Sequence, residues 1–518
     1  MKRIISVFLC MVMLTGIFAS CKRDNGPVVP TADTVEDTTA LTQAEKAKQI
    51  KIGYFQEKAL NPFETNSPLN RNLSALVYDS LFVIEDDFSA LPLIAEDFTN
   101  EGKKLTVQIA EELYFSDGSP LTAKDVVYSF RLAKESAFFG KRLSNIATAT
   151  SGENSVIFTL KNSHINAESD LVFPIVKSGT GEKKYPTGSG RYKFKKIDGE
   201  LYLKANENST RGEEMLVDTI RLTPVSADES EIYLLQTGDL TTFYDDLSDG
   251  SFTKINVNME RVPLNNLVFI GFNNKKKFLK DTAVKKAIEL CTDKKTICDA
   301  AFDGYCRLSD TIFNPSWSVT LENEKYESVF SVMEAKDVLQ NAGYIYAYSH
   351  NKYRSKNFEF LKLKFIVCKD SKSKVEAAEL ITKNMRSAGI EVTLQKLSFD
   401  EYSQAVKYGD YDLYLGEVAL SPSMDLSVFF SPDGELSSGI EADSAVSGAY
   451  FDYASGTIDY STFNQVIIHE KPFIPICYRD GMVCFSRELS YEGSVNQYDL
   501  YKNAYSWELK SSSDNILP

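Results

Sequence analysis

The chain alternates between two patterns of apolar positions, one with a period of two residues and one with helical spacing. Residues 49–55, "QIKIGYF", place apolar and polar side chains alternately, as a strand with one buried face does. In residues 69–82, "LNRNLSALVYDSLF", the apolar positions recur on one helical face: Leu69, Leu73, Leu76, Val77 and Leu81. The pattern predicts a strand and then a helix at the start of the folded part.

The same succession returns between residues 361 and 418. The runs "LKLKFIV" (361–367) and "EVTLQKL" (391–397) predict strands, and residues 374–390 predict a helix that ends at Gly389. Residues 399–418 predict a helix that continues into a further strand. Alternating strands and helices are typical of an α/β domain with a partly parallel sheet.

Two predicted helices begin with a capping signal. In "FSDGSPLTAKDVVYSF" (115–130), Thr122 is the predicted N-cap and Asp125 stands at the third helical position, which is the arrangement of a capping box. This stretch can satisfy its polar groups internally, so we interpret it as scaffold. Residues 281–302 predict a second helical region, with Thr282 as its N-cap.

The first twenty residues differ from the rest of the chain. Lys2-Arg3 precedes an apolar run of about fifteen residues, and Ala19-Ser20 precedes Cys21, which is typical of an export signal. This segment resembles a bacterial lipoprotein signal, which is cleaved before a cysteine that is then acylated. A spanning anchor is the alternative, but it needs roughly 20 apolar residues. We therefore expect a signal peptide over residues 1–20 and a flexible tether over residues 21–48.

Composition places the remaining chain among soluble globular proteins. The chain has 518 residues, of which 43% are hydrophobic and 25% charged, and its length predicts about two or three domains. Its formal net charge is −15. Because binding to nucleic acid depends on a basic face, we expect no nucleic-acid partner.

Six cysteines follow Cys21, and none belongs to a C-x-x-C pair, so the sequence does not support a zinc or thioredoxin-type site. Cys477 and Cys484 lie symmetrically about Asp480-Gly481. If this dipeptide forms a two-residue hairpin turn, the two cysteines face each other across two strands. An exported protein could join them in a disulfide, and two free core thiols are the alternative.

Enzyme motifs are absent from the sequence. "HEKPF" at His469 lacks the second histidine of a zincin helix, "SGTGEKK" (178–184) lacks the spacing of a phosphate loop, and no G-x-S-x-G is present. We therefore expect no catalytic residues, no metal site and no cofactor. If the protein serves a pump, another subunit must hydrolyse the ATP.

Several segments carry a family resemblance in the same order along the chain. They are "LNPFETNS", "LVYDSLFVIEDDFSALPLIAEDF", "LYFSDGSPLTAKDVVYSFRLA", "PTGSGRYKF", "LQTGDLTTF" and "FIGFNNKKKFLKDTAVKKAIELCTDKKTI". Together they resemble the extracytoplasmic solute-binding proteins of ABC importers of the oligopeptide, dipeptide and nickel type, known as family 5. In "PTGSGRYKF", Arg191 replaces the proline of the family pattern. The resemblance covers roughly Ile50 to Trp507.

This resemblance implies an α/β, bilobal, periplasmic-binding-protein-like fold of the class II type, which closes on its ligand. The implied lobe one is discontinuous, with an insert domain at residues 81–185, and lobe two covers residues 264–478. Two crossing segments near Pro263 and Tyr478 would form the hinge. The segments of lobe one would be residues 49–80, 186–263 and 479–515.

The resemblance also implies where the ligand binds. In peptide-binding members an aspartate pairs with the peptide's ammonium group, and "EVALSPSMDLSVFF" puts Asp425 in that role; a helix-capping acid ahead of "LSVFF" is the alternative. Leu426 replaces the family's proline, and Lys369 stands near the position of the dipeptide binders' carboxylate-clamping arginine. The other candidate ligand-binding residues are Glu417, Ser421, Ser423, Gln56 and Glu57.

We accordingly expect a monomeric receptor, anchored by a lipid at Cys21 on the periplasmic or outer cell-surface side of a membrane. It would capture a short oligopeptide and deliver it to ABC permease and ATPase subunits. A solute-binding protein for a non-peptide ligand and a sensing or adhesion lipoprotein are the alternatives. An enzyme on this scaffold is the least supported reading, since the sequence has none of its motifs.

Overall fold

The computed structural model describes residues 49–510, apart from 210, 213–214, 227–229, 249–255, 324–326 and 356, and also residues 37–38. In this part, one mixed sheet of twelve strands has the order β1-β9-β10-β11-β2-β12-β20-β13-β19-β17-β18, with β14 paired to β20. Its first half contains β1 (Asp37–Thr38), β2 (Ile50–Phe55), β9 (Tyr192–Ile197), β10 (Glu200–Ala205), β11 (Thr219–Val225) and β12 (Thr242–Asp245). Its second half contains β14 (Cys306–Leu308), β17 (Lys362–Cys368), β18 (Glu391–Leu397) and β19 (Leu413–Ala419).

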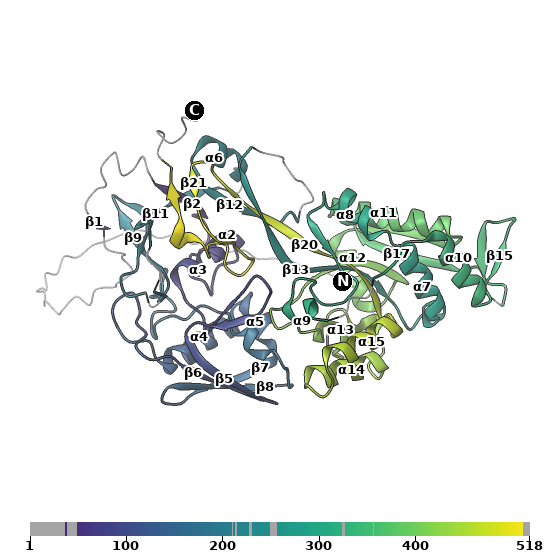
Figure 1. Cartoon of the computed structure of the whole chain (residues 1–518), viewed down its shortest axis with the longest axis horizontal. Coiled ribbons are helices and arrows are strands. Elements are labelled where there is room, and N and C mark those ends of the chain that lie inside the picture. The colour runs from purple at the N-terminus through teal and green to yellow at the C-terminus, as the bar shows by residue number, and fades with distance from the viewer. Residues whose placement is uncertain are drawn as a thin grey trace, which may run out of the picture. The chain divides into compact units, whose positions relative to one another are not determined.

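Two long strands join the halves of this sheet. β13 (Asn258–Phe272) and β20 (Phe473–Phe485) run antiparallel to each other, and Figure 1 shows them side by side. β20 pairs with β12 near its end and with β14 near its middle. The register between β13 and β20 shifts between Pro263 and Leu267. The chain therefore passes between the two halves twice, on paired strands.

Helices cover both faces of the second half of the sheet. Along β13, Val268 and Ile270 pack into one hydrophobic core, whereas Leu267 and Phe269 pack into another. This alternation follows from the period of a strand that is buried on both faces. The first core receives α7 (Thr282–Leu290), α8 (Lys294–Ala301), α10 (Val332–Asn341) and α11 (Lys372–Ser387). The second receives α12 (Phe399–Tyr408), α13 (Ser427–Phe430), α14 (Ala445–Ala454) and α15 (Tyr460–Glu470).

A small antiparallel sheet has a hydrophobic core of its own. Its order is β5-β6-β8-β7, and its strands are β5 (Ala95–Glu101), β6 (Lys104–Ile109), β7 (Ile146–Ser151) and β8 (Ser155–Leu160). Val126 and Phe130 of α4 (Ala123–Glu135) pack into this core together with Phe158 of β8. The short helix α5 (Phe139–Arg142) follows α4.

The remaining elements are short. Beside the first half of the sheet lie α2 (Pro68–Asn72), α3 (Ser74–Val77), α6 (Glu231–Thr237) and the strand pair β21 (Leu489–Ser490) and β22 (Glu508–Leu509). The others are the pair β3 (Phe82–Ile84) and β4 (Ala90–Pro92), helix α9 (Ser318–Leu321), and the pair β15 (Ile345–Ala347) and β16 (Lys352–Arg354). No helix among the described residues has both the length and the apolar character needed to cross a membrane.

Several predicted elements are confirmed. The strands and helices expected between residues 361 and 418 are present as β17, α11, β18, α12 and β19, and Gly389 has the positive φ of a helix C-terminal glycine. The capping box is present too, because the backbone N–H and the hydroxyl of Thr122 both donate to Asp125 Oδ2, at 2.9 and 2.7 Å. Asp125 Oδ1 accepts from the N–H of Ser178, so this stretch is held within the scaffold.

Two helix predictions were wrong in detail. Residues 69–82 form two short helices, α2 and α3, followed by the start of β3, and not one helix. The N-cap of α7 is Asp281, whose side chain accepts from the N–H of Ala283 at 2.9 Å, and not Thr282. A carboxylate at this position also interacts favourably with the helix dipole.

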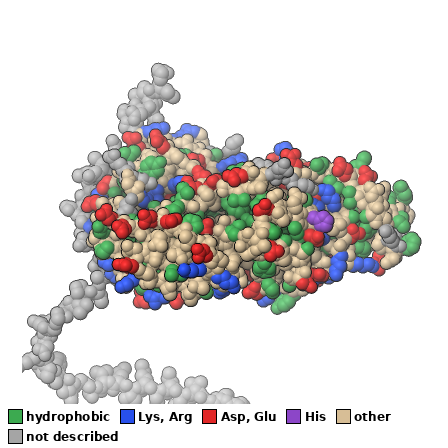
Figure 2. Space-filling model, turned by 60° about the horizontal axis from the view of Figure 1, so that its bottom comes forward, with side chains coloured by type: hydrophobic (Ala, Val, Ile, Leu, Met, Phe, Trp, Pro, Cys, Tyr) green, Lys and Arg blue, Asp and Glu red, His purple; other side chains and the backbone are tan. Residues whose placement is uncertain are grey.

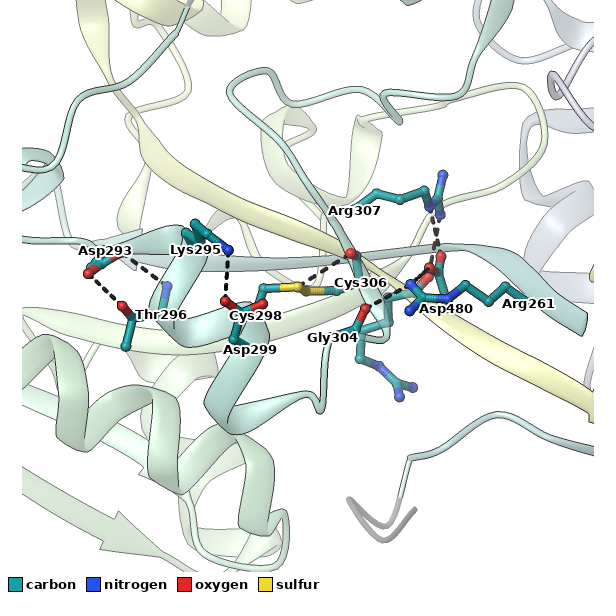
Figure 3. The surroundings of a disulfide bond; sticks show 11 residues. Arg261, Asp293, Lys295, Thr296, Cys298, Asp299, Gly304, Cys306, Arg307 and Asp480 are labelled. Atoms are coloured by element: carbon teal, nitrogen blue, oxygen red, sulfur yellow. Dashed lines mark hydrogen bonds and ion pairs between the residues drawn. A yellow bond between two sulfur atoms is a disulfide. The ribbon is translucent and has the colours of Figure 1, made fainter. Parts of the chain in front are cut away.

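The hairpin turn predicted at Asp480-Gly481 was wrong. Both residues lie inside β20, where they pair with Pro263 and Val262 of β13. Asp480 accepts from Arg307 Nε at 2.7 Å and lies 3.6 Å from Arg261 Nη1, so its carboxylate has partners within the sheet (Figure 3). Cys477 and Cys484 therefore lie on one strand, and both are buried free thiols.

A disulfide joins Cys298 of α8 to Cys306 of β14 (Figure 3). It closes the loop between these two elements. Within the loop, the Gly304 carbonyl oxygen accepts from Arg261 Nη1 of β13 at 2.8 Å, and the Tyr305 carbonyl oxygen accepts from the N–H of Asp480 at 2.9 Å. The disulfide loop thus contacts both strands that join the halves of the sheet.

Candidate functional site

A cavity of about 590 Å³ lies where distant segments of the chain meet. Its walls come from α2 and α3, from α5, from residues 172–174 and from the C-terminal residues 497–505. This volume falls within the range of about 300–1,000 Å³ that is usual for small-molecule sites. Six aromatic side chains line it: Tyr78, Phe138, Phe139, Phe173, Tyr498 and Tyr505.

Five basic side chains also line the cavity: Arg71, Arg142, Arg191, Arg211 and Lys502. Three of them are paired with acids. Arg191 Nη1 lies 3.2 Å from Asp499 Oδ2, Arg211 Nε lies 2.7 Å from Asp79 Oδ1, and Lys502 Nζ lies 2.7 Å from Glu85 Oε2. Each of these three basic groups therefore already has a charged partner, and the ion pairs hold the cavity walls in place.

The other two arginines share an aromatic ring. The Arg71 guanidinium carbon lies 3.7 Å from the centroid of the Phe138 ring, and that of Arg142 lies 5.2 Å from the same centroid. Arg142 Nη1 donates to the Val172 carbonyl oxygen at 2.9 Å. Burial, and then the nearby charge of Arg142, lower the pKa of Arg71 to about 10. Both guanidinium groups nevertheless stay charged at neutral pH.

The basic lining contrasts with the outside of the molecule. On the face drawn in Figure 2, acidic and basic side chains are interspersed over the described surface. The chain as a whole has a formal net charge of −15. Positive charge inside a concave site of a negative protein favours an anionic ligand group.

The buried acid Asp170 contacts the loop that follows β19. The Ser423 hydroxyl donates to Asp170 Oδ2 at 2.9 Å, and the Ser421 and Ser423 hydroxyls lie 2.7 Å apart. Asp170 Oδ1 is buried without a hydrogen-bond partner among the described residues. Burial, and then the negative charge of Asp425, raise the pKa of Asp170 to about 7. Ser421 and Ser423 were both predicted site residues.

Asp425 lies in the same loop, at the start of α13. Its carboxylate accepts from the N–H and the hydroxyl of Ser427, at 2.9 and 2.7 Å, and from the Tyr450 hydroxyl. His164 Nε2 lies 4.0 Å from Asp425 Oδ1, and burial lowers the pKa of His164, which favours its neutral form. Asp425 therefore accepts from the residue two positions on, whereas the N-cap of α13 is Leu426, which makes no side-chain cap hydrogen bond. The Asp425 side chain keeps 19% of its surface exposed.

Comparison with known proteins identifies the family. Residues 90–435, more than half of the chain, match the family model described as "Bacterial extracellular solute-binding proteins, family 5 Middle". The chain belongs to this family. It is a family 5 solute-binding protein with the bilobal α/β fold of that group.

Two curated relatives and one solved structure illustrate the likeness. The chain is 23% identical to the oligopeptide-binding protein AppA of Bacillus subtilis, over 91% of this chain and 94% of AppA. It is 22% identical to the glutathione-binding protein GsiB of Escherichia coli K12, over 83% of this chain and 89% of GsiB. The crystal structure of a nickel ABC transporter protein from Bacillus halodurans superposes with a TM-score of 0.74 at 18% identity, covering 89% of this chain and all of that one.

The structure places another predicted site residue of this family 5 protein, Glu417, in a buried ion-pair cluster. Its carboxylate lies 2.7 Å from Arg479 Nε and 2.7 Å from Lys374 Nζ, and it accepts from Asn266 Nδ2 at 2.9 Å. Arg479 belongs to β20, so the cluster ties β19 to a joining strand through its neighbour β13. A role of Glu417 in ligand binding stays a prediction.

None of the predicted ligand-binding residues lines the 590 Å³ cavity. Gln56 and Glu57 line a smaller cavity of about 300 Å³ at the end of β2, together with Pro224 and its neighbours at the end of β11. Lys369 is exposed after β17. Cys21, the predicted lipidation site, is outside the described residues. Among the residues that the structure covers, no three His, Cys, Asp or Glu side chains gather in a way that could hold a metal ion.

Sequence reasoning missed Arg71 and Arg142. Arg71 was part of a predicted helix, and Arg142 belongs to "FFGKRLSN", to which no role was given. The one local signal in this region was Arg191, which replaces the family's proline and in the structure lines the same cavity. The two missed arginines come together only in the folded chain, where both guanidinium groups lie near the Phe138 ring.

Proposed function

We propose that this protein is the lipid-anchored receptor of an ABC importer, which captures a short peptide and delivers it to a membrane permease powered by ATPase subunits. The observation that carries the proposal is the cavity of about 590 Å³ with aromatic and basic walls, built on a family 5 fold whose two halves are joined by paired strands. The lining of this cavity comes from lobe one and the insert domain, so a ligand bound there would favour a closed form if it also reached lobe two near Asp425, and a permease could then recognise that form.

The proposed division of the chain follows these strands. Lobe one comprises residues 49–80, 186–263 and 479–515, of which 511–515 lie outside the described residues; the insert domain comprises 81–185 and lobe two 264–478. The hinge lies near Pro263 and Tyr478. Residues 1–20 form the signal peptide and 21–48 the tether, both outside the described ranges except for β1. The receptor acts as a monomer, without a cofactor and without nucleic acid.

The names of the relatives support a peptide ligand. AppA is an oligopeptide-binding protein and GsiB a glutathione-binding protein, so peptides are bound on this fold at similar sequence distances. A nickel protein shares the fold as well, and a non-peptide ligand is therefore the competing proposal. The volume of about 590 Å³ is suited to a short peptide.

Asp425 is the proposed partner of the peptide's ammonium group. An ionised carboxylate offers about four acceptor positions, and three donors already approach Asp425, from Ser427 twice and from Tyr450 once. One position therefore remains for a ligand donor. An ammonium group would add an opposite charge to a site where His164 is neutral.

The experiment begins with native mass spectrometry of the purified protein, which reads out any ligand that remains bound. Titration calorimetry with a pool of tripeptides then compares free with N-acetylated peptides, for the wild type and for Asp425→Asn. We expect the substitution to weaken binding of free peptides by about 10-fold to 100-fold and to leave the acetylated pool nearly unchanged. Asp433→Asn, at an exposed position nearby, is the matched control. Equal losses for both pools would refute the ammonium role, and co-purification of a metal chelate or sugar would refute the peptide ligand.

A further inference from the structure

Residues 164–170 of the proposed insert domain contact the proposed lobe two through polar groups. The N–H of Ile165 donates to the Ala454 carbonyl oxygen at 2.9 Å. The Ser423 hydroxyl donates to Asp170 Oδ2, also at 2.9 Å. Figure 1 shows β8, which precedes this segment, beside α14, which ends at Ala454. These contacts exist only while the insert domain lies against lobe two.

Asp170 is buried with little to compensate a negative charge. Its Oδ2 accepts from the neutral hydroxyl of Ser423, and its Oδ1 has no hydrogen-bond partner in the described part of the chain. A buried carboxylate that lacks a charged partner in hydrogen-bond contact favours its protonated form. The geometry of this contact therefore favours a neutral Asp170.

The titratable and charged groups that face Asp170 come from four other segments. They are Asp425, Tyr450 of α14, Arg142 of α5 and Tyr498 near the C-terminus. Burial raises the pKa of both tyrosines, so neither is charged at neutral pH. Burial also raises the pKa of Asp170 to about 7; Asp425 acts in the same direction and Arg142 against it.

His164, at the other end of the segment, is held in its neutral form. Its Nδ1 accepts from the N–H of Asn166 at 3.3 Å, which leaves the ring proton on Nε2. Nε2 lies 4.0 Å from Asp425 Oδ1. Burial lowers the pKa of His164, and the charge of Asp425 only partly offsets this effect.

We propose that His164 and Asp170 form a proton-linked latch, which holds the insert domain against lobe two with His164 neutral and Asp170 protonated. The latch rests on the proposed function, because it acts only if these two parts of the chain separate when the receptor opens. Opening would remove Ser423 and Asp425 from beside the two side chains and expose both to water. At mildly acidic pH, Asp170 would then release a proton to water and His164 would take one up.

The two groups respond to pH in opposite directions. The contact raises the pKa of Asp170 from 3.8 to about 7, so Asp170 favours the closed form at low pH and this effect is lost as the pH rises through 7. The contact lowers the pKa of His164 from 6.5, so His164 opposes closure as the pH falls below 6.5. In the wild type the two contributions partly cancel.

Pulsed dipolar spectroscopy between two spin labels measures closure of the purified mature chain without any ligand. The labels are attached at Lys141→Cys of the insert domain and Glu435→Cys of lobe two. In the structure Lys141 Nζ lies 3.5 Å from Glu435 Oε1, and both side chains are exposed. The free cysteines of the described residues are buried, so the introduced thiols take the labels.

Three variants separate the contributions. His164→Asn and Asp170→Asn each remove one titrating group, and Ser423→Ala removes the donor to Asp170. His469→Gln and Glu96→Gln, at exposed positions, are the matched controls. Thermal melts show that each variant is folded.

We expect the ratio of closed to open molecules of His164→Asn to rise by about 10-fold to 100-fold from pH 8 to pH 5, because Asp170 alone then titrates. The ratio for Asp170→Asn should fall over the same range, and the wild type should lie between these variants. Ser423→Ala should be more open at every pH, and both controls should match the wild type.

Two results would overturn the latch alone: parallel pH profiles for His164→Asn and Asp170→Asn, or wild-type labels that stay far apart at every pH. A single short distance in every variant at every pH would overturn the latch and also the separation of the proposed lobes. Failure of peptides to bind in calorimetry would refute the peptide ligand, while this ligand-free measurement would still decide the latch.

Discussion

Replacing Glu417 by glutamine separates a structural role from a ligand-binding role. Glu417 Oε1 accepts from Arg479 Nε at 2.7 Å and from Asn266 Nδ2 at 2.9 Å, and Oε2 accepts from Lys374 Nζ at 2.7 Å. The Glu417 side chain is 13% exposed and that of Arg479 only 5%. Burial acts to raise the pKa of Glu417, but the charges of Arg479 and Lys374 outweigh burial and bring the pKa down to about 2.

The size of the effect follows from this pKa. A decrease from 4.5 to about 2 corresponds to about 3 kcal/mol of folding free energy at neutral pH, at about 1.4 kcal/mol per pKa unit. Glu417→Gln also leaves Arg479 buried beside a neutral group, and breaking a buried pair in this way costs about 3–5 kcal/mol. The amide oxygen of the new glutamine can still accept one hydrogen bond, so we expect a loss near the lower end of this range. We expect the free energy of unfolding to fall by about 3 kcal/mol.

Urea unfolding followed by circular dichroism measures this loss at several pH values. Because the folded-state pKa of Glu417 lies below the unfolded value of 4.5, its stabilisation is complete above pH 4.5 and is lost as the pH falls toward 2. The difference between wild type and Glu417→Gln should therefore shrink in that window. Glu379→Gln, which removes a carboxylate from an exposed pair with Lys396, is the matched control. If Glu417→Gln unfolds like this control and only loses ligand affinity, the structural reasoning is wrong.

Two further predictions concern the cysteines. Replacing Cys298 and Cys306 together by serine opens a loop with a sequence separation of 8 residues. The chain-entropy relation then gives a loss of about 2.5 kcal/mol, measured by urea unfolding with and without a reductant on the wild type; an unchanged unfolding midpoint after reduction would contradict the disulfide's contribution. Cys21→Ala should move the protein from the membrane fraction to the soluble fraction on immunoblots, because it removes the acylation site, whereas Cys10→Ala in the same leader should not. Membrane retention of Cys21→Ala would speak for a spanning anchor.

The sequence predicted best where local and tertiary preferences agree. The period of the apolar residues between 361 and 418 matches the observed strands and helices, because those elements bury one or both faces in the two cores on either side of the sheet. The capping box at Thr122 is complete within four residues and needs no distant partner. The 69–82 segment shows the limit of such patterns, since its apolar spacing continues through a break between α2 and α3.

The error at Asp480-Gly481 has a tertiary cause. An Asp-Gly pair favours a tight turn when nothing else determines the backbone. Here β13 pairs with β20 on both sides of this dipeptide, and Asp480 is bound to Arg307, which itself donates to the Leu264 carbonyl oxygen of β13 at 2.7 Å. The long strand pairing and the buried ion pair together outweigh a turn preference, and neither can be seen in a window of ten residues.

The candidate site was predictable only in part, for the same reason. Asp425 was proposed because the family resemblance fixes its segment, and its role as a ligand partner stays a prediction. Arg71 and Arg142 are separated by most of the insert domain, so only the fold reveals that they share Phe138.

The two halves of the proposed site are connected through Asp170, which interacts electrostatically with both Arg142 and Asp425. An ammonium group at Asp425 would reduce the negative charge that raises the pKa of Asp170, and a carboxylate at Arg142 would remove the positive charge that lowers it. The two charged groups of such a peptide therefore shift the pKa of Asp170 in opposite directions.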